Sequence, residues 1–330
     1  MAMNRKRVLV PVVMDKAGID LLRARDDIDL TLYELGRPQE QFRAMLGDVA
    51  GIALSLTPFG AAEMAAAPHL AVVARIGVGY DAVDVPALTA QRVPLMIAGT
   101  SNSTSVAEHA LFFILAVAKR AGEMDRRVKT GNWPDRRRDL PVELSGKTAL
   151  VVGFGRIGSR SAPRLAAFGM QVLVHDPYVP AERIRAAGFE PVADLDAALP
   201  RVDFVTIHCP KNAETNGMFG AARFARMKRG SFIVNTARGG IINEPALLAA
   251  LESGQIAAAG LDVFEKEPAD ADNPLLKHEA VFTAPHMAGV TVESMAAMAE
   301  TTARNILGVL DGTPNVENAV NPEVFERRPG

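Results

Sequence analysis

The chain has 330 residues, of which 48% are hydrophobic and 22% charged, which is typical of a protein with two domains of ordinary size. Its 36 basic and 38 acidic side chains nearly cancel, so nothing in the composition favours a nucleic acid or an anionic membrane, and small molecules are the expected partners. Cys209 is the single cysteine, which excludes an intrachain disulfide and a cysteine-based zinc site and is typical of a reducing compartment.

The start of the chain is predicted to be a strand and not a targeting segment. The apolar run at residues 8–14 ends at Asp15 and Lys16, too early for the core of a signal peptide. The longest apolar run, at residues 110–118, is far shorter than the roughly 20 residues that span a bilayer. We therefore expect a cytoplasmic protein without a membrane partner.

Short β-branched runs alternate with alanine-rich stretches along the chain, which is typical of parallel strands joined by covering helices and predicts an α/β fold. In the first hundred residues the predicted strands are 8–13, 52–55, 72–76 and 95–97. A capping box, Ser105-Val-Ala-Glu108, then predicts the start of a long helix, because the serine can cap a backbone amide and the glutamate can reach back to the cap.

From Lys147 onward the alternation of strands and helices restarts with stronger signals. The predicted strands are 148–152, 172–174, 204–207, 232–235, 260–263 and 281–283. Six strands are enough for a complete dinucleotide-binding sheet. A last helix rich in alanine and methionine, at residues 292–310, is too short to form a domain and is expected to return to the first domain.

A glycine-rich turn follows the first strand of this second sheet. The sequence Gly153-Phe-Gly155-Arg-Ile-Gly158 lies between a predicted strand and a helical stretch, which is the context that a dinucleotide fingerprint requires. Gly153 allows the tight turn, Gly155 lets the backbone approach a pyrophosphate, and Gly158 lets helix and strand pack closely. The free amides at the start of the helix would then face the phosphates.

Asp176 ends the next predicted strand, 21 residues after Gly155. A carboxylate at this position can accept hydrogen bonds from the ribose of adenosine, and it would repel a 2′-phosphate. The pattern therefore predicts NAD in preference to NADP. The alternative is a plain glycine turn followed by a helix-capping aspartate, which would need no cofactor.

Three charged residues follow successive predicted strands of the second sheet: Arg238, Glu267 and His286. Strand ends are where an open α/β sheet binds its ligands. Arg238 offers a planar fork that matches a carboxylate and could also polarise the neighbouring carbonyl. His286 can exchange a proton near neutral pH, and a carboxylate close to it would stabilise its imidazolium form. Any one of these residues alone is more often solvated or structurally paired, and it is their combination with the fingerprint that favours catalysis.

Together these motifs resemble the D-isomer-specific 2-hydroxyacid dehydrogenase family over essentially the whole chain. The motifs that carry the resemblance, in the family order, are Arg75-Ile-Gly-Val-Gly-Tyr-Asp81 and residues 153–158, 235–240, 262–268 and 285–286. The resemblance implies an NAD-dependent oxidoreductase that transfers a hydride between nicotinamide and a small 2-oxo or 2-hydroxy acid.

The resemblance also implies a role for each site residue. Arg238 would bind the substrate carboxylate and orient its carbonyl, His286 would be the general acid and base, and Glu267 would support His286. The residues that it places around the substrate are Arg75, Val78 and Gly79. The residues that it places around NAD(H), besides the three glycines and Asp176, are Arg156, Ile157, Cys209, Thr236, Ala237, Asp262 and Gly289. No catalytic metal is expected, since the other histidines show no metal-ligand spacing.

The family resemblance predicts two Rossmann-like doubly wound domains. The NAD-binding domain, at residues 104–290, would be inserted into a smaller, flavodoxin-like substrate domain at residues 1–103 and 291–330. Catalysis would lie in the cleft between them, closed by a hinge motion. The resemblance also suggests a homodimer, because the stretch around Trp133 is similar to a family segment near the dimer contact.

One short stretch of sequence bears on the choice of substrate. In phosphoglycerate dehydrogenases of the family an Arg-Ser-x-Thr stretch helps to hold the phosphate, whereas this chain has Leu54-Ser55-Leu56-Thr57, which favours glyoxylate, hydroxypyruvate or a similar short acid. Arg75 keeps a cation nearby, so D-3-phosphoglycerate stays open. Formate is disfavoured, because the formate dehydrogenases of the superfamily usually have glutamine in place of Glu267.

A hypothesis from another class, an NAD-sensing corepressor-like binding protein, stays open too, although no basic patch supports it. Two remaining features favour structural roles. His109 lies on a mostly apolar helix and is interpreted as a satisfied packing histidine. The run Arg136-Arg-Arg138 is interpreted as a solvated turn in preference to a device that steers an anionic substrate.

Overall fold

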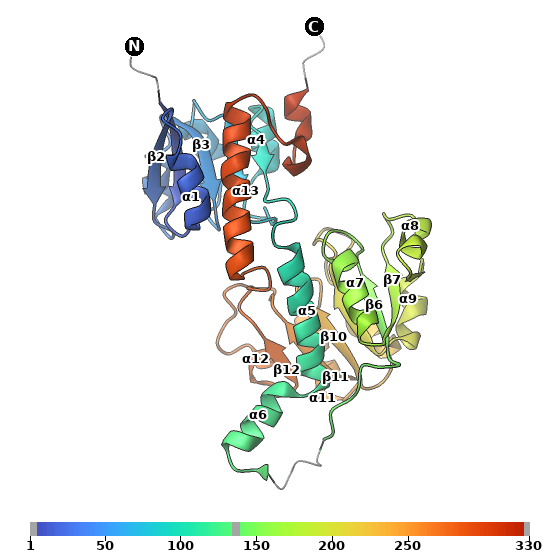
Figure 1. Ribbon diagram of the computed structural model, residues 1–330. Helices are drawn as coiled ribbons and strands as arrows, with labels where there is room; N and C mark the ends of the chain where they lie inside the picture. Colours follow the sequence, from blue (N-terminus) through green and yellow to red (C-terminus); the bar gives the residue numbers. More distant parts are fainter. Residues whose placement is uncertain (1–4, 134–138, 327–330) are drawn as a thin grey trace. The chain divides into compact units, whose positions relative to one another are not determined.

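The computed structural model describes residues 5–133 and 139–326 (Figure 1). Backbone contacts divide the chain into two compact units. Unit 1 is Met1–Asn102 with Val290–Gly330, and unit 2 is Ser103–Gly289. Each unit contains a parallel β-sheet with helices on both faces. The predicted α/β fold with two doubly wound sheets is thereby confirmed.

The sheet of unit 1 has the strand order β2-β1-β3-β4-β5, and all neighbours are parallel. Its strands are β1 Lys6–Pro11, β2 Ile28–Tyr33, β3 Val49–Leu54, β4 Val72–Arg75 and β5 Leu95–Met96. Its helices are α1 Lys16–Arg23, α2 Gln39–Arg43, α3 Ala61–Ala66, α4 Val85–Ala90 and α13 Val292–Leu310, with short 3-10 turns at Val316–Asn318 and Pro322–Phe325. Because side chains alternate along a strand, Val8 and Val10 pack with α1 and α13, whereas Leu9 packs with α2, α3 and α4. The helix α13 thus belongs to the core of unit 1.

The sheet of unit 2 has the order β12-β11-β10-β9-β6-β7-β8 and is also parallel. Its strands are β6 Thr148–Val152, β7 Gln171–His175, β8 Glu190–Pro191, β9 Phe204–Ile207, β10 Ser231–Asn235, β11 Ile256–Leu261 and β12 Val281–Thr283. Its helices are α5 Ser103–Ala118, α6 Ala121–Lys129, α7 Gly158–Ala167, α8 Ala181–Ala186, α9 Leu195–Ala198, α10 Ala221–Arg226, α11 Glu244–Glu252 and α12 Pro274–Lys277, with a 3-10 turn at Leu199–Arg201. Val151 packs on the side of α5 and α7, whereas Leu150 and Val152 pack on the side of α10 and α11.

The direction of winding reverses at β6 in unit 2. From β6 the chain proceeds to β7 and β8 on one side, then returns to β9 on the other side and continues to β12. In a doubly wound sheet the loops at the carboxyl ends of the strands on either side of such a reversal form the ligand-binding crevice. The loops after β6 and β9, which begin at Gly153 and His208, are therefore where a dinucleotide is expected.

Most of the predicted elements are present, but two strands were not predicted, and the predicted starts of one strand and one helix were wrong. The predictions omitted β2 and β8, which are edge strands, and β8 has only two residues. The strand β11 begins at Ile256, four residues before its predicted start. The helix α5 begins at Ser103, so Ser105 lies inside it and does not form the predicted capping box. Glu108 instead pairs with Arg164 of α7, at 3.3 Å.

Candidate active site

The glycine turn after β6 is shaped for close approach of a ligand. Gly153 has φ of +94°, and a Cβ there would lie 2.7 Å from the backbone nitrogen of Cys209. A Cβ at Gly158 would lie 1.9 Å from the carbonyl oxygen of Gly153, so the first turn of α7 packs directly on the loop. At Gly155 a Cβ would meet no atom within 4 Å, and the residue is exposed. The backbone at Gly155 is thus open to a phosphate, beside the amides at the start of α7.

Asp176 follows β7 directly and is held in place by two backbone amides. Its Oδ2 accepts a hydrogen bond from the nitrogen of Phe154 at 2.7 Å, and its Oδ1 accepts one from the nitrogen of Tyr178 at 2.9 Å. Each carboxylate oxygen has a second acceptor position, so the oriented carboxylate can still accept hydrogen bonds from a ribose. The bond to Phe154 also ties Asp176 to the glycine turn.

Two buried polar atoms near the same sheet edge have no hydrogen-bond partner within the described residues. They are Oγ1 of Thr236, which follows β10, and Nδ1 of His208, which follows β9. Burial lowers the pKa of His208 to about 3, so its ring is neutral. Burial also raises the pKa of the neighbouring Cys209 thiol to about 11. Unpaired buried polar groups are rare in proteins, and a bound dinucleotide would supply polar partners at this edge. The residues present therefore fit such a cofactor.

His286 and Glu267 form a direct pair. The Nδ1 atom of His286 lies 2.6 Å from Oε2 of Glu267, and the nitrogen of Phe264 donates to Oε1 of Glu267 at 3.0 Å. Both side chains are partly exposed. Because a carboxylate can only accept, the hydrogen of this pair is on Nδ1 of the imidazole, and Nε2 is the ring nitrogen left to exchange a proton.

The backbone at His286 adopts an unusual conformation that Asp262 stabilises. His286 has φ of +53°, a left-handed conformation that costs a non-glycine residue roughly 1–2 kcal/mol. Its nitrogen donates to the carbonyl of Asp262 at 2.7 Å. The carboxylate of Asp262, which is 1% exposed, accepts from the nitrogens of Met287 at 2.8 Å and Ala288 at 2.9 Å. Three hydrogen bonds to one buried residue thus hold the turn that presents His286.

Arg238 lies on a turn that is packed against the loop of Glu267. The buried side chain of Asn235 accepts from the nitrogen of Ala237 at 3.0 Å and donates to the carbonyl of Arg238 at 2.9 Å, which closes the turn after β10. A Cβ at Gly239 would lie 1.7 Å from the carbonyl oxygen of Phe264. The turn that carries Arg238 therefore contacts the loop that carries Glu267. The guanidinium of Arg238 donates to the carbonyl of Ala237 at 2.7 Å.

The predicted substrate residues of unit 1 lie at the carboxyl end of β4. Arg75 is 8% exposed, and its guanidinium donates to the carbonyls of Gly79 at 2.8 Å and Leu54 at 3.0 Å. Arg75 thus shapes the loop of Val78 and Gly79 and joins it to the end of β3. Val78 and Gly79 are partly exposed.

A family model matches residues 111–288 of this chain, which lie within unit 2. The model is described as "D-isomer specific 2-hydroxyacid dehydrogenase, NAD binding domain". The chain belongs to this family. Unit 2 is its NAD-binding domain, and the cofactor is NAD(H).

The relatives of this chain include enzymes of several names. The D-3-phosphoglycerate dehydrogenase of Archaeoglobus fulgidus is 39% identical over 315 residues, which are 96% of this chain and 59% of that protein. The chain spans only about half to three fifths of the length of such curated relatives. Among solved structures, a protein of Thermus thermophilus has 30% identity and a TM-score of 0.86, covering 95% of this chain and 99% of its own. A glyoxylate reductase of Paecilomyes thermophila has 28% identity and a TM-score of 0.84, covering 96% and 99%.

The remaining site residues predicted from the family lie on the same loops of unit 2. Arg156 and Ile157 complete the glycine turn, and Ile157 is the residue before α7. Gly289 is the last residue of unit 2. Ala237 is buried, and it belongs to the turn that Asn235 closes.

Two residues of this site differ from the sequence-based predictions, Asn235 and His109. Asn235 was not predicted as a site residue, although a buried amide at a strand end is a signal for a structured turn. The ring of His109 packs edge-on against Phe113 at 4.5 Å, and burial lowers its pKa, with the charge of Asp262 acting in the opposite sense. Its Nε2 has no hydrogen-bond partner within the described residues, so it packs as predicted but is not satisfied. The run 136–138 lies outside the described residues.

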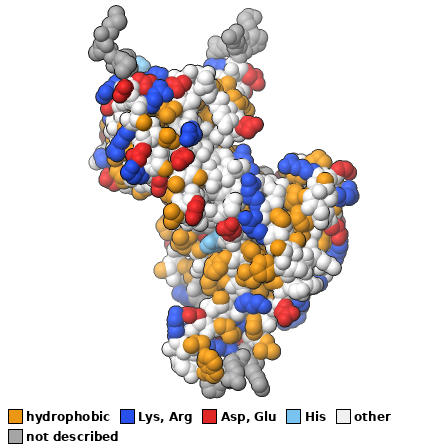
Figure 2. Space-filling model, viewed as in Figure 1, with side chains coloured by type: hydrophobic (Ala, Val, Ile, Leu, Met, Phe, Trp, Pro, Cys, Tyr) orange, Lys and Arg blue, Asp and Glu red, His pale blue; other side chains and the backbone are white. Residues whose placement is uncertain are grey.

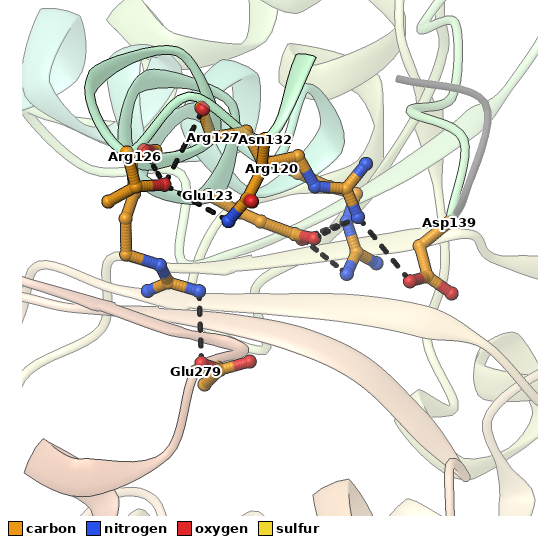
Figure 3. A pocket seen from close by; sticks show the side chains of 8 residues that line it. Arg120, Glu123, Arg126, Arg127, Asn132, Asp139 and Glu279 are labelled. Atoms are coloured by element: carbon orange, nitrogen blue, oxygen red, sulfur yellow. Dashed lines mark hydrogen bonds and ion pairs between the residues drawn. The ribbon is translucent and has the colours of Figure 1, made fainter. Parts of the chain in front are cut away.

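A polar cavity of about 220 Å³ lies beside α6 in the NAD-binding domain (Figure 3). Figure 3 shows Arg126 directed to Glu279, at 2.9 Å, and the guanidinium groups of Arg120 and Arg127 directed to Glu123. The basic groups are thus matched by acidic groups within the cluster. We interpret this cluster as a link between α6 and the loop before β12, and not as a substrate site.

In residues 5–133 and 139–326 two other kinds of feature are absent, a metal-binding cluster and a membrane-spanning helix. No three or more His, Cys, Asp or Glu side chains in these ranges are grouped so as to hold a metal ion. None of the helices in these ranges combines the length and the apolar character needed to cross a membrane.

Proposed function

We propose that the protein is an NAD-dependent D-2-hydroxyacid dehydrogenase that works as a reductase of a small 2-oxo acid or in the reverse direction. The observation that carries the proposal is the distance of 2.6 Å between Nδ1 of His286 and Oε2 of Glu267. The loop of Glu267 packs against the turn of Arg238, and both follow strands of the dinucleotide-binding sheet. A proton donor, a carboxylate that supports it and a carboxylate-binding cation are the groups that this reaction needs.

When bound, NADH would supply the hydride for C2 of the 2-oxo acid. His286 donates the proton on Nε2 to the substrate carbonyl oxygen, while Glu267 on the opposite side of the ring stabilises the imidazolium before the transfer. After the transfer the imidazole is neutral, and its partial exposure lets it regain a proton from water. In the oxidative direction the same nitrogen accepts the hydroxyl proton.

Arg238 would bind the substrate carboxylate and attract the electron density that gathers on the carbonyl oxygen. In this proposal unit 1 is the substrate domain, and the backbone amides of Val78 and Gly79 bind the other edge of the carboxylate. Arg75 stabilises that loop through the hydrogen bond that it donates to the carbonyl of Gly79. The residues proposed for the cofactor are those of the glycine turn, Asp176, and the loops after β9, β10, β11 and β12.

We propose glyoxylate or hydroxypyruvate as the preferred substrate. Leu54, which is fully buried at the end of β3, and Leu56, which is 77% exposed, have apolar side chains, so neither brings a positive charge to this edge of unit 1. Arg75 is buried and donates to two backbone carbonyls. These features favour a short acid without a phosphate.

D-3-phosphoglycerate dehydrogenase is the second candidate, because the curated relatives at 38–43% identity carry that name. One feature of unit 1 supports it as well. A cavity of about 320 Å³ at the carboxyl ends of β2 and β3 is lined by Leu56 and Thr57 together with Arg37, a cation outside the motif considered above, although Glu34 lines it as well.

Specificity constants with NADH decide among these functions. The panel is glyoxylate, hydroxypyruvate, phenylpyruvate and 3-phosphohydroxypyruvate. The proposal expects the first two to be best, and D stereochemistry in the product of hydroxypyruvate. A preference for 3-phosphohydroxypyruvate that is lost in Arg37→Ala would favour the second candidate instead. NADH binding with negligible turnover of the whole panel would refute the enzymatic function and favour an NAD sensor.

We further propose that the protein is a homodimer that associates through the region of α6. Val128, Trp133 and Leu140 are exposed there, and Phe112 of α5 is exposed as well. Figure 2 shows hydrophobic side chains gathered on the visible face of this part of unit 2. Exposed aromatic and aliphatic side chains in one region are typical of an interface. Light scattering should give twice the chain mass of 35.2 kDa for the wild type and a lower mass for Val128→Asp, with Phe168→Asp as the control. A monomeric wild type would contradict the proposal.

A further inference from the structure

Two loops at the crevice of unit 2 are joined by a hydrogen bond between side chains. The hydroxyl of Tyr178, in the loop after β7, donates to Oε2 of Glu214, in the loop after β9, at 2.5 Å. Both loops lie at the carboxyl ends of their strands, on either side of the glycine turn. Sequence patterns alone give neither residue a role.

The loop that carries Glu214 is well ordered by its own hydrogen bonds. Oδ1 of Asn212 accepts from the nitrogen of Glu214 at 2.9 Å and from the nitrogen of Thr215 at 3.0 Å. The hydroxyl of Thr215, which is buried, donates to the carbonyl of Pro210 at 2.7 Å. Glu214 therefore projects from a defined turn, and its bond to Tyr178 determines where its carboxylate lies.

The same tyrosine connects Glu214 to Asp176. The backbone nitrogen of Tyr178 donates to Asp176, and its hydroxyl donates to Glu214. The charges of both carboxylates act on the hydroxyl of Tyr178 and raise its pKa, Glu214 through its hydrogen bond first. One residue thus holds two carboxylates in the part of the crevice where adenosine is expected.

The partners of these carboxylates leave their negative charges in place. A phenol and a backbone amide are neutral donors, whereas the exposed carboxylate of Glu190, in the same unit, pairs with the guanidinium of Arg201 at 2.7 Å. Within the described residues the hydrogen bonds of both carboxylates come from neutral donors, so their two negative charges would repel a group that carries about two negative charges, as a 2′-phosphate does.

We propose that Glu214, positioned by Tyr178, is a second specificity-determining carboxylate, which acts with Asp176 to exclude 2′-phosphorylated dinucleotides. This inference rests on the proposed function as an NAD-dependent dehydrogenase. Glu214 acts on the cofactor directly, and Tyr178 acts through Glu214.

Direct binding of NADH and NADPH, measured by calorimetry without substrate, tests the proposal. Glu214→Gln should tighten NADPH binding about fivefold at 0.1 M salt and change NADH binding less than twofold, with a larger effect at low salt, where charges are less screened. Tyr178→Phe keeps the ring but removes the hydrogen bond to Glu214, so the logarithm of the NADPH affinity should change by about half as much as in Glu214→Gln. Asp176→Ser is the positive control, and Glu252→Gln, an exposed carboxylate at the end of α11, is the matched charge control.

The ultraviolet titration of tyrosine in the cofactor-free protein is an independent measurement. If the hydrogen bond exists in solution, Glu214→Gln should lower the pH at which one of the three tyrosines ionises, and Tyr178→Phe should remove that transition. An unchanged ratio of NADPH to NADH affinity in Glu214→Gln, alongside a changed ratio in Asp176→Ser, would overturn this inference alone. A wild type that binds neither cofactor would overturn the proposed function, and this inference with it.

Discussion

Replacement of Asp262 by asparagine tests whether this buried carboxylate holds the turn of His286. The two side chains have almost the same size, but asparagine has one acceptor oxygen and no charge. In the native turn both carboxylate oxygens accept backbone amides, from Met287 at 2.8 Å and Ala288 at 2.9 Å. The side chain of Asp262→Asn could accept only one of these bonds, and its NH2 group would face the other N–H.

The expected loss follows from the energy of these bonds. A hydrogen bond to a charged group contributes about 1.5–3 kcal/mol net, and leaving a buried N–H unpaired costs a further ~1–3 kcal/mol. We expect about 3 kcal/mol less free energy of unfolding for unit 2. Because His286 holds a left-handed backbone that is costly without this support, it should move from its place beside the substrate. If the whole of this ~3 kcal/mol is lost from the transition state, kcat/KM falls about 100-fold.

Two measurements check this prediction, urea unfolding without cofactor and steady-state kinetics with the best 2-oxo acid. Asp272→Asn, an exposed carboxylate in the segment between β11 and α12, is the control and should change neither. The reasoning is refuted if Asp262→Asn unfolds like the wild type without cofactor. A loss of NADH affinity with unchanged stability would instead assign Asp262 to the nicotinamide, as the family resemblance implies.

Further predictions concern His286, His208 and Cys209. His286→Ala should lower kcat about 10³-fold with NADH affinity retained. His286→Gly should be equally inactive but more stable than His286→Ala by roughly 1 kcal/mol, because glycine adopts positive φ without strain. Urea unfolding in which the alanine variant is the more stable of the two would contradict this. Burial lowers the pKa of His208 to about 3 from its ordinary value of 6.5, so between these pH values the unfolded chain binds a proton that the native ring does not. The free energy of unfolding should therefore fall as the pH drops below 6.5, by up to about 1.4 kcal/mol per pH unit, and His208→Gln should remove this part of the slope in unfolding curves from about pH 7 to pH 5. Cys209 is partly buried, and this burial raises its pKa to about 11, so its thiol should react slowly with an aromatic disulfide reagent at about pH 8 and rapidly in urea. Rapid reaction of the native protein would contradict this prediction.

The strands that could be predicted from the sequence are those buried on both faces. In β6 and β9 the residues are nearly all apolar, because helices cover both sides of an inner parallel strand. The edge strand β2 has only its end residues buried, so it shows no apolar run. The strand β8 is too short to carry any pattern. The start of α5 was misjudged because Ser105 and Glu108 have the spacing of a cap, while the chain turns into the helix two residues earlier.

The sequence determined the fold class, the glycine turn and the family, because each depends on residues close together along the chain or on a distinctive set of motifs. It also indicated His286, Glu267 and Arg238, since the ends of parallel strands meet at one edge of a sheet.

Only the tertiary structure decided how these residues are supported. Asp262 reaches the turn of His286, Asn235 closes the turn of Arg238, and Tyr178 meets Glu214 across two loops. Such contacts depend on the direction in which each side chain leaves its strand end and on the backbone angles of the loop that follows. Those angles, including the positive φ of His286, are set by the packing of several loops against one another, which no local pattern in the sequence records.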